Sequence, residues 1–174
     1  MDLPIIIDTR EQAPYTFANY RATTKREALP SGDYSILGYG DYVAVERKEL
    51  GDLLACLSYD RDRFGRELQR LKGYEAAAVV VEATFDAIQA GNYRSRMNPE
   101  AATQSLISIM EKYRIPIFFA ADRKAGEFFT YHFLRHYANH AAKKYKALYD
   151  YAQAQIKREK QIHATIKRYG DKNR

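Results

Sequence analysis

The sequence predicts an α/β domain, in which a mixed sheet is flanked by helices on both faces. Two observations lead to this prediction. Short runs composed almost entirely of apolar residues recur along the chain, as they do in strands that are covered on both faces. Between these runs, apolar residues recur three and four positions apart, a spacing typical of amphipathic helices. Strands that alternate with helices favour layers around one sheet.

The first part of the chain is expected to supply three strands. Each is an apolar or aromatic run, and Gly38-Tyr39-Gly40-Asp41 between the second and the third is typical of a hairpin turn. Residues 12–30 are polar and contain Pro14 and Pro30, which predicts an irregular loop. The three expected strands are Leu3–Asp8, Tyr34–Leu37 and Tyr42–Lys48.

Helices and two further strands are expected after these. Leucines recur at i, i+3, i+4 and i+7 from Leu50, and Thr84 and Asn98 are typical helix N-caps. The apolar runs Ala77–Glu82 and Ile115–Ala121 predict the strands. The expected helices lie at residues 50–57, around 64–71, 84–91, 99–113 and 122–137, and helical signals continue to about residue 169 as a basic C-terminal extension.

The chain carries a basic excess that is concentrated in its last part. It has 174 residues, of which 46% are hydrophobic, and this suffices for one globular domain with a core. Lys and Arg number 28 against 22 Asp and Glu. Ten basic and three acidic residues lie between Ala138 and Arg174. A basic surface favours a polyanionic partner, nucleic acid before a membrane surface.

Cysteine usage and hydropathy restrict the class of protein further. Cys56 is the sole cysteine, which excludes an intramolecular disulfide and a cysteine-based zinc cluster. No apolar run approaches the ~20 residues of a membrane span, and residues 1–4 are unlike a signal peptide. We therefore expect no membrane partner and an intracellular location, in the cytoplasm or nucleoid of a prokaryote or virus or in the nucleus of a eukaryote.

Charged residues follow the apolar runs and indicate a site. Glu46 and Lys48 are two positions apart in one strand, so their side chains share a face at its end. Asp8 and Asp33 lie beside the ends of other strands, where the sites of open α/β sheets gather. A carboxylate that holds a divalent cation and a lysine that orients or helps to deprotonate water can together hydrolyse a phosphodiester. The alternative is a strand that ends in a solvated charge cluster.

The order of these residues resembles a known signature. Gly32-Asp33, followed after twelve residues by Glu46-Arg47-Lys48 and then by Asp52, is similar to the motif of the XPF/Mus family of structure-specific DNA endonucleases, which includes archaeal Hef. Ile7-Asp8-Thr9-Arg10-Glu11 resembles the family's opening strand, and Asp62-Arg63-Phe64 resembles its Gly-Arg-Leu/Phe helix, with Asp62 where glycine is usual. The resemblance covers about residues 3–137 and implies a restriction-endonuclease-like fold.

The resemblance implies a metal-dependent endonuclease that cuts flaps, forks or other junctions in DNA repair or recombination, as a homodimer. It implies Mg²⁺ or Mn²⁺ held by Asp8, Asp33 and Glu46, with Lys48 acting on the nucleophilic water. Asp52 is expected to pair with Arg47 or Lys48, or to be an ordinary first-turn acid. The implied catalytic residues are Asp8, Arg10, Asp33, Glu46, Arg47, Lys48 and Asp52.

The chain departs from the family after the nuclease domain. Members usually carry a tandem helix-hairpin-helix domain, whose hairpins need glycines, and after Gly126 this chain has only Gly170. We expect a stand-alone form, with a nuclease domain at residues 1–140 and a basic helical tail at 141–174. The tail, up to Lys167-Arg168-Tyr169, is either a DNA-tracking arm or a solvated helix. The expected DNA-binding residues are Arg10, Arg63, Lys143, Lys144, Lys146, Lys157 and Arg158.

Two other functions stay open, and one further motif has two interpretations. The same fold occurs in resolvase-like and restriction-type nucleases that act on duplex DNA. A non-cleaving scaffold that binds branched DNA is a second alternative, although such partners lose the acids or the lysine that this chain retains.

His132, His136 and His140 recur every four residues, which favours a structural stripe over a zinc site because no acid or cysteine is nearby in sequence.

Overall fold

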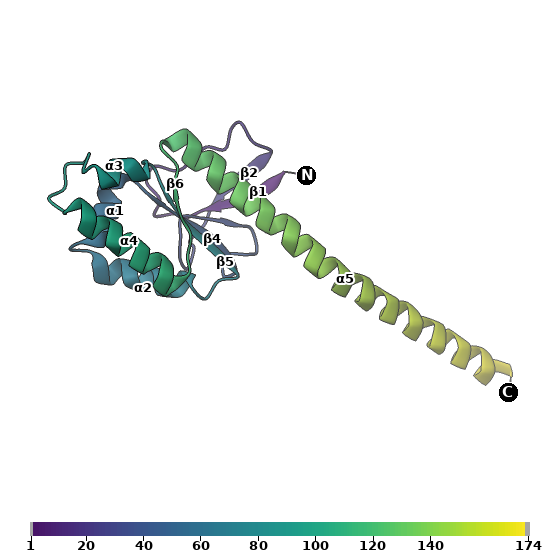
Figure 1. The fold of residues 1–174 in the computed structure, drawn as a ribbon. Coiled ribbons are helices and arrows are strands. Elements are labelled where there is room, and N and C mark those ends of the chain that lie inside the picture. Colours follow the sequence, from purple (N-terminus) through teal and green to yellow (C-terminus); the bar gives the residue numbers. More distant parts are fainter. Residues whose placement is uncertain (1, 173–174) are drawn as a thin grey trace. The chain divides into compact units, whose positions relative to one another are not determined.

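One mixed sheet forms the centre of the part of the chain that the structure describes. The computed structural model describes residues 2–172, and the side chains of residues 2–163. Six strands of this part are ordered β2-β1-β3-β4-β5-β6 across the sheet (Figure 1). They are β1 (Leu3–Ile7), β2 (Ala22–Arg26), β3 (Tyr34–Ile36), β4 (Val43–Lys48), β5 (Ala76–Val81) and β6 (Ile117–Phe119).

The strand directions bring several chain segments to one edge of this sheet. β1 and β4 both run antiparallel to β3, while β5 and β6 continue parallel to β4. The C-terminal ends of β1, β4, β5 and β6 therefore lie at the same edge as the N-terminal end of β3. In register, Ile7 lies opposite Tyr34 and Lys48 lies opposite Val81. The charged residues at and beyond these ends consequently collect at that edge.

Helices cover one face of the sheet, as Figure 1 shows for α1, α2 and α4. Their buried side chains pack with Ala44, Val79 and Val81 of the sheet in one apolar core. The expected caps are confirmed: the side chain of Thr84 accepts a hydrogen bond from the Ala87 N–H, and Asn98 begins its helix in the same way. The helices are α1 (Leu50–Leu57), α2 (Arg61–Leu71), α3 (Phe85–Gln89) and α4 (Pro99–Tyr113).

The first part of α5 (Arg123–Lys172) covers the opposite face. Gly126 of this helix lies against Tyr15 and Val80. The ring of Phe129 lies 3.6 Å from that of Phe118 in β6. The predicted fold class, a mixed sheet with helices on both faces and a C-terminal helical extension, is therefore confirmed.

The edge strand β2 was not expected, because residues 12–30 were predicted to form an irregular loop. Ala22–Arg26 pairs with β1 in parallel, and four of its five side chains are exposed. An exposed strand lacks the alternation or apolar run by which strands are recognised. Its lysine and arginine are typical of edge strands, which avoid pairing with other chains by carrying charge.

The chain divides into two compact units, Met1–Tyr137 and Ala138–Arg174. The expected division at residues 140 and 141 stays a prediction. In the second unit, Lys146 and Asp150 form an ion pair of 2.7 Å one helical turn apart. The side chains of Lys167, Arg168 and Tyr169, and residues 173–174 of the expected tail, lie outside the described residues. Within residues 2–172, no helix is both long enough and apolar enough to cross a membrane.

Gly126→Ala is expected to lower the free energy of unfolding by about 1–3 kcal/mol through overpacking. A Cβ at this position would lie 2.2 Å from Tyr15 Oη. Tyr15 is 2% exposed and its ring stacks on Tyr34, so it has no room to move away. Gly51→Ala is the matched control, because its Cβ would meet nothing within 4 Å and the helix should gain up to about 1 kcal/mol.

Urea unfolding of the three proteins measures both effects. A Gly126→Ala protein as stable as the wild type would show that Tyr15 and α5 adjust to each other freely.

Candidate active site

A cavity of about 480 Å³ lies at the edge of the sheet where β1, β3, β4 and β5 meet. Its wall is predominantly polar and combines acids with bases. Residues from the segment after β1, from the turn before β3, from β4, and from α1 and α2 contribute to it. The lining includes Arg10, Glu11, Asp33, Glu46, Arg47, Lys48, Glu49, Asp52, Asp60 and Arg63.

Backbone hydrogen bonds to the two neighbouring chain segments hold Asp33 at this edge of the sheet. Its N–H donates to the Val45 carbonyl at 2.9 Å, and its own carbonyl accepts from the Asp8 N–H at 2.8 Å. Gly32 permits this approach because its φ is 81° and a Cβ there would lie 2.8 Å from the Ala44 Cβ. The glycine of the Gly-Asp motif therefore lets the chain pass close to β4.

Asp33, which is half-buried, and Glu46, which is buried, form an acidic pair. The Asp33 carboxylate accepts a hydrogen bond of 2.7 Å from the Arg47 N–H, and Glu46 is 3% exposed. Burial raises the pKa of Asp33 to about 7, with a further increase from the charge of Glu11, against the Arg47 hydrogen bond. Burial, and then the charge of Asp33, raise the pKa of Glu46 well above its usual range. The two carboxylates therefore favour an additional positive charge between them.

Lys48 supplies part of that charge. It donates a hydrogen bond to Glu46, its Nζ lies 4.0 Å from Glu67, and it lies 5.4 Å from the centre of the Phe64 ring. Burial alone would lower the pKa of Lys48, but the charge of Glu46 and this hydrogen bond raise it above its ordinary value. Lys48 therefore remains an ammonium group near neutral pH.

The side chain of Arg47 braces the edge of the sheet. It is 7% exposed, and its guanidinium lies 3.2 Å from Glu11 and 3.0 Å from Glu82. It also contacts the exposed carboxylate of Glu49 at 3.3 Å. These contacts connect the segment after β1 with the ends of β4 and β5. The guanidinium of Arg47 is thus already paired with carboxylates of the same chain.

Asp8 is also held by the chain. Its carboxylate accepts hydrogen bonds from the Arg10 guanidinium and from the N–H groups of Arg10 and Leu29, at 2.7–3.0 Å. Burial would raise the pKa of Asp8, but these bonds together lower it. Both carboxylate oxygens thus have partners, and Asp8 connects the turn after β1 with the segment after β2. Arg10 is paired with an acid of its own segment.

Two other expected residues lie on the exposed side of the same cavity. Asp52 lines the cavity but is exposed, and the expected pairing with Arg47 or Lys48 is not found, because both cations contact glutamates instead. Arg63 stands at the rim, with its side chain 72% exposed and 3.7 Å from Asp60. Lys143, Lys144, Lys146, Lys157 and Arg158 belong to the second compact unit.

Several site residues carried little or no signal in the sequence. Glu11 belongs to the Asp-x-Arg-Glu segment, and Glu82 ends an apolar run, so both had a local pattern. Glu67 reaches Lys48 from α2; it lies in the helix that resembles the family's, but nothing in the sequence indicated it as a site residue. Arg123 contacts Glu82 at 3.5 Å and donates to the carbonyls of residues 13 and 14 at 2.7 Å each. Only the tertiary structure brings Glu67 and Arg123 to this edge.

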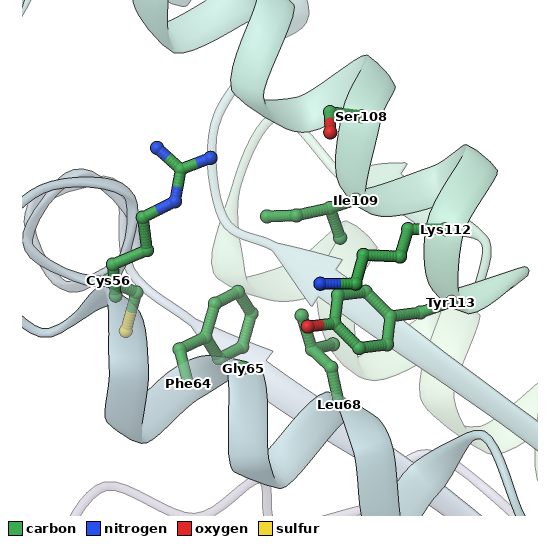
Figure 2. A pocket seen from close by; sticks show the side chains of 9 residues that line it. Cys56, Phe64, Gly65, Leu68, Ser108, Ile109, Lys112 and Tyr113 are labelled. Carbon is green, nitrogen blue, oxygen red and sulfur yellow. The ribbon is translucent and has the colours of Figure 1, made fainter.

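A smaller cavity of about 90 Å³ lies between α2 and α4 (Figure 2). Phe64 and Leu68 of α2 face Ile109 and Tyr113 of α4 there. Its lining contains no carboxylate. It is therefore a packing space between helices and offers no ligands for a hard cation.

The donor set of the larger cavity fits a cation held by two carboxylates. Within the described residues, no group of three or more His, Cys, Asp or Glu side chains is placed to hold a metal ion. The expected trio with Asp8 is thus not brought together, because the Asp8 oxygens already have donors. Mg²⁺ commonly uses only one or two carboxylates, with waters and substrate phosphates as its other ligands. The raised pKa values of Asp33 and Glu46 agree with this arrangement.

Among solved structures, the chain is similar to XPF from Aeropyrum pernix. One such structure matches with a TM-score of 0.61 and 23% identity, covering 76% of this chain and 60% of that chain. Another, of XPF from A. pernix in complex with DNA, matches with a TM-score of 0.61 and 22% identity, covering 79% and 66%. The chain thus spans less than two thirds of either relative. A comparison with curated proteins found no match.

The mixed sheet, with Glu46 and Lys48 at the end of β4 and Asp33 beside them, places the chain among proteins with the fold of XPF from A. pernix. The family model of the ERCC4 domain matches residues 7–133. The chain therefore belongs to the ERCC4 domain family. The family resemblance inferred from the sequence is confirmed.

Asp33→Asn is expected to change how stability depends on pH. A carboxyl with a pKa of about 7 in the folded state and about 4 when unfolded binds more protons in the folded state between these values. Its contribution to stability is therefore full below about pH 4 and is lost as the pH rises towards 7. Asparagine does not titrate, so the variant does not undergo this pH-dependent loss of stability. The Tm of the variant relative to wild type should therefore be higher at pH 8 than at pH 5.

Thermal unfolding in EDTA from pH 5 to pH 8 measures this difference. Asp52→Asn is the matched control, because it removes an exposed acid from the same cavity. A Tm difference for Asp33→Asn that is constant with pH would show that Asp33 titrates normally.

Proposed function

We propose that this chain is a divalent-cation-dependent endonuclease that hydrolyses phosphodiester bonds in branched DNA during repair or recombination. The proposal rests on one observation: Asp33, Glu46 and Lys48 line one cavity in a chain of the ERCC4 domain family. A similar structure was solved in complex with DNA, which supports DNA as the substrate.

Asp33 and Glu46 are the proposed ligands of Mg²⁺ or Mn²⁺. The backbone carbonyl of Arg47 is a third candidate ligand. Carbonyls two residues apart in a strand point in the same direction, and the Val45 carbonyl points towards Asp33, whose N–H it accepts. A bound cation would supply Lewis acidity and a water of lowered pKa. Asp8 is proposed to position neighbouring groups and not to bind the cation, since its carboxylate accepts hydrogen bonds from the Arg10 guanidinium and from the Leu29 N–H.

Lys48 is proposed to orient the attacking water and to stabilise negative charge at the phosphate. Its raised pKa favours an ammonium that donates hydrogen bonds, and disfavours a general base. Arg10 and Arg63 are exposed at the rim and are proposed to contact DNA phosphates. Arg47 is proposed to support the site from behind, because its guanidinium is already engaged by Glu11 and Glu82.

A duplex-cutting nuclease of the same fold and a non-cleaving scaffold are the alternatives. The first would cut linear duplex as well as branched DNA. The second would bind branched DNA without cutting it. The product map on several DNA shapes separates them, because the three functions predict different substrates and products.

Lys48→Ala and Asp33→Asn are each expected to reduce cleavage by at least about 100-fold, the lower range for loss of a group that acts on the proton or the developing charge. Wild type and variants are assayed on flap, fork, four-way junction, linear duplex and single-stranded DNA, with Mg²⁺, Mn²⁺ or EDTA. Asp86→Asn in α3, an exposed acid that does not line the cavity, is the control and should cut normally. Cleavage in EDTA, or by both variants at the wild-type rate, would contradict the mechanism.

The proposed assembly is a homodimer through α4, β6 and the first part of α5, residues 99–137. Ile107 and Phe128 support this surface, because they are large apolar side chains that are 49% and 54% exposed. Residues 141–174 are proposed to be a DNA arm through Lys143, Lys144, Lys146, Lys157 and Arg158.

Removal of residues 142–174 is expected to weaken DNA binding and to flatten its salt dependence, because fewer phosphates would be neutralised. Fluorescence anisotropy over a range of salt concentrations measures both quantities. Light scattering of the same two proteins gives their molar mass. Unchanged binding would show that the arm is a solvated helix, and a monomeric whole chain would contradict the dimer.

A further inference from the structure

A row of arginines runs along α2 from the candidate active site. Arg63, Arg66 and Arg70 are spaced i, i+3 and i+7, so they share one face of the helix. All three are exposed. The buried residues of α2, which include Phe64 and Leu68, point away from this face. The row is therefore a surface feature that packing does not require.

The neighbours of α2 fix where this row begins. On one flank, α2 packs against α4, where Gly65 and Leu68 meet Tyr113 (Figure 2). On its other flank, Glu67 reaches to 4.0 Å from Lys48 Nζ. Arg63 lies one turn before Glu67 and lines the active-site cavity itself. The row thus begins at the cavity and continues along the exposed side of the helix.

The charges of this row are available to a ligand. Among the described residues, the carboxylate nearest to Arg63 is that of Asp60 at 3.7 Å, and none forms an ion pair with Arg66 or Arg70. Guanidinium groups bind phosphate oxygens in a bidentate manner. Over seven residues the helix rises about 10.5 Å. This is close to the axial rise of about three nucleotides of one strand, at 3.4 Å each.

We propose that Arg63, Arg66 and Arg70 form a track for the phosphates of the DNA strand that leaves the cavity. The inference rests on the proposed nuclease function and adds a path for the substrate. Arg63 holds the phosphate next to the site, and Arg66 and Arg70 hold those that follow. The track positions the duplex without reading its sequence, since phosphate contacts carry no base information.

The first test compares two double variants with equal loss of charge. Arg66→Ala with Arg70→Ala removes the track, and Arg94→Ala with Arg96→Ala removes two exposed arginines from the loop before α4. DNA affinity is measured by fluorescence anisotropy between 50 and 300 mM salt, values chosen so that counterion release dominates. The track variant should lower the slope of log K against log salt by about 1.8, which is about 0.9 for each lost phosphate contact.

The control variant should keep the wild-type slope. Arg66→Lys with Arg70→Lys preserves the charge and should keep most of the slope, which separates charge from a change in fold. Melting curves of all variants should coincide with that of the wild type, because the altered side chains are exposed.

The second test locates the track on the DNA. Neutral methylphosphonate linkages replace single phosphates on either side of the cut in a flap substrate. Wild type should lose affinity at about three positions within a stretch of about four consecutive phosphates on one side of the cut, because a rise of about 10.5 Å spans three steps of 3.4 Å. The track variant should be insensitive at the positions that Arg66 and Arg70 contact, and the control variant should reproduce the wild-type map.

The outcomes separate the inference from the function on which it rests. If wild type binds and cuts branched DNA while the track variant matches the control in slope and map, the track is refuted and the nuclease function stands. If wild type neither binds nor cuts any of the DNA shapes, the proposed function fails, and the track fails with it.

Discussion

The buried guanidinium of Arg47 is the interaction on which this edge of the sheet depends. It lies between Glu11 and Glu82, which come from the segment after β1 and the end of β5. Removing one partner from such a buried cluster costs about 3–5 kcal/mol, because the remaining charges lose their compensation. The backbone of the same residue donates to Asp33. One residue thus holds three chain segments and the acid that faces the cavity.

The alternation of side chains along β4 explains how three adjacent charges serve two purposes. Glu46 and Lys48 share a face with Ala44, which packs in the core beneath α1 and α2. Arg47 points to the other face, towards Glu11 and Glu82. The continuous run of charge at the end of this buried strand is therefore divided between an ion pair that lines the cavity, Glu46 with Lys48, and the guanidinium of Arg47, which holds the neighbouring segments. The tight course of the backbone at Gly32 then allows Asp33 to join the pair.

Keeping Asp33 and Glu46 ionised beside each other costs free energy, and the proposed binding of a cation would offset this cost. Burial raises the pKa of Asp33 and that of Glu46, the charge of Asp33 raises the pKa of Glu46 further, and Lys48 compensates only part of this charge. Such a site favours a hard cation and, with it, the phosphates of a nucleic acid. The acids are thereby compatible with a protein whose net charge is +6. The rim and α2 present exposed arginines beside this acidic site.

The sequence by itself determined the helices, the apolar strands and the spacing of Asp33, Glu46 and Lys48, because these depend on local periodicity and on a motif. It did not reveal β2, whose exposed side chains follow no hydrophobic pattern. The tertiary structure alone decided that the Asp8 oxygens are taken by Arg10 and Leu29, that Asp52 pairs with neither Arg47 nor Lys48, and that Glu67 approaches the lysine. The reason is physical: a charge is paired with whichever group the fold brings near, and Glu82 lies 35 residues from Arg47 along the chain.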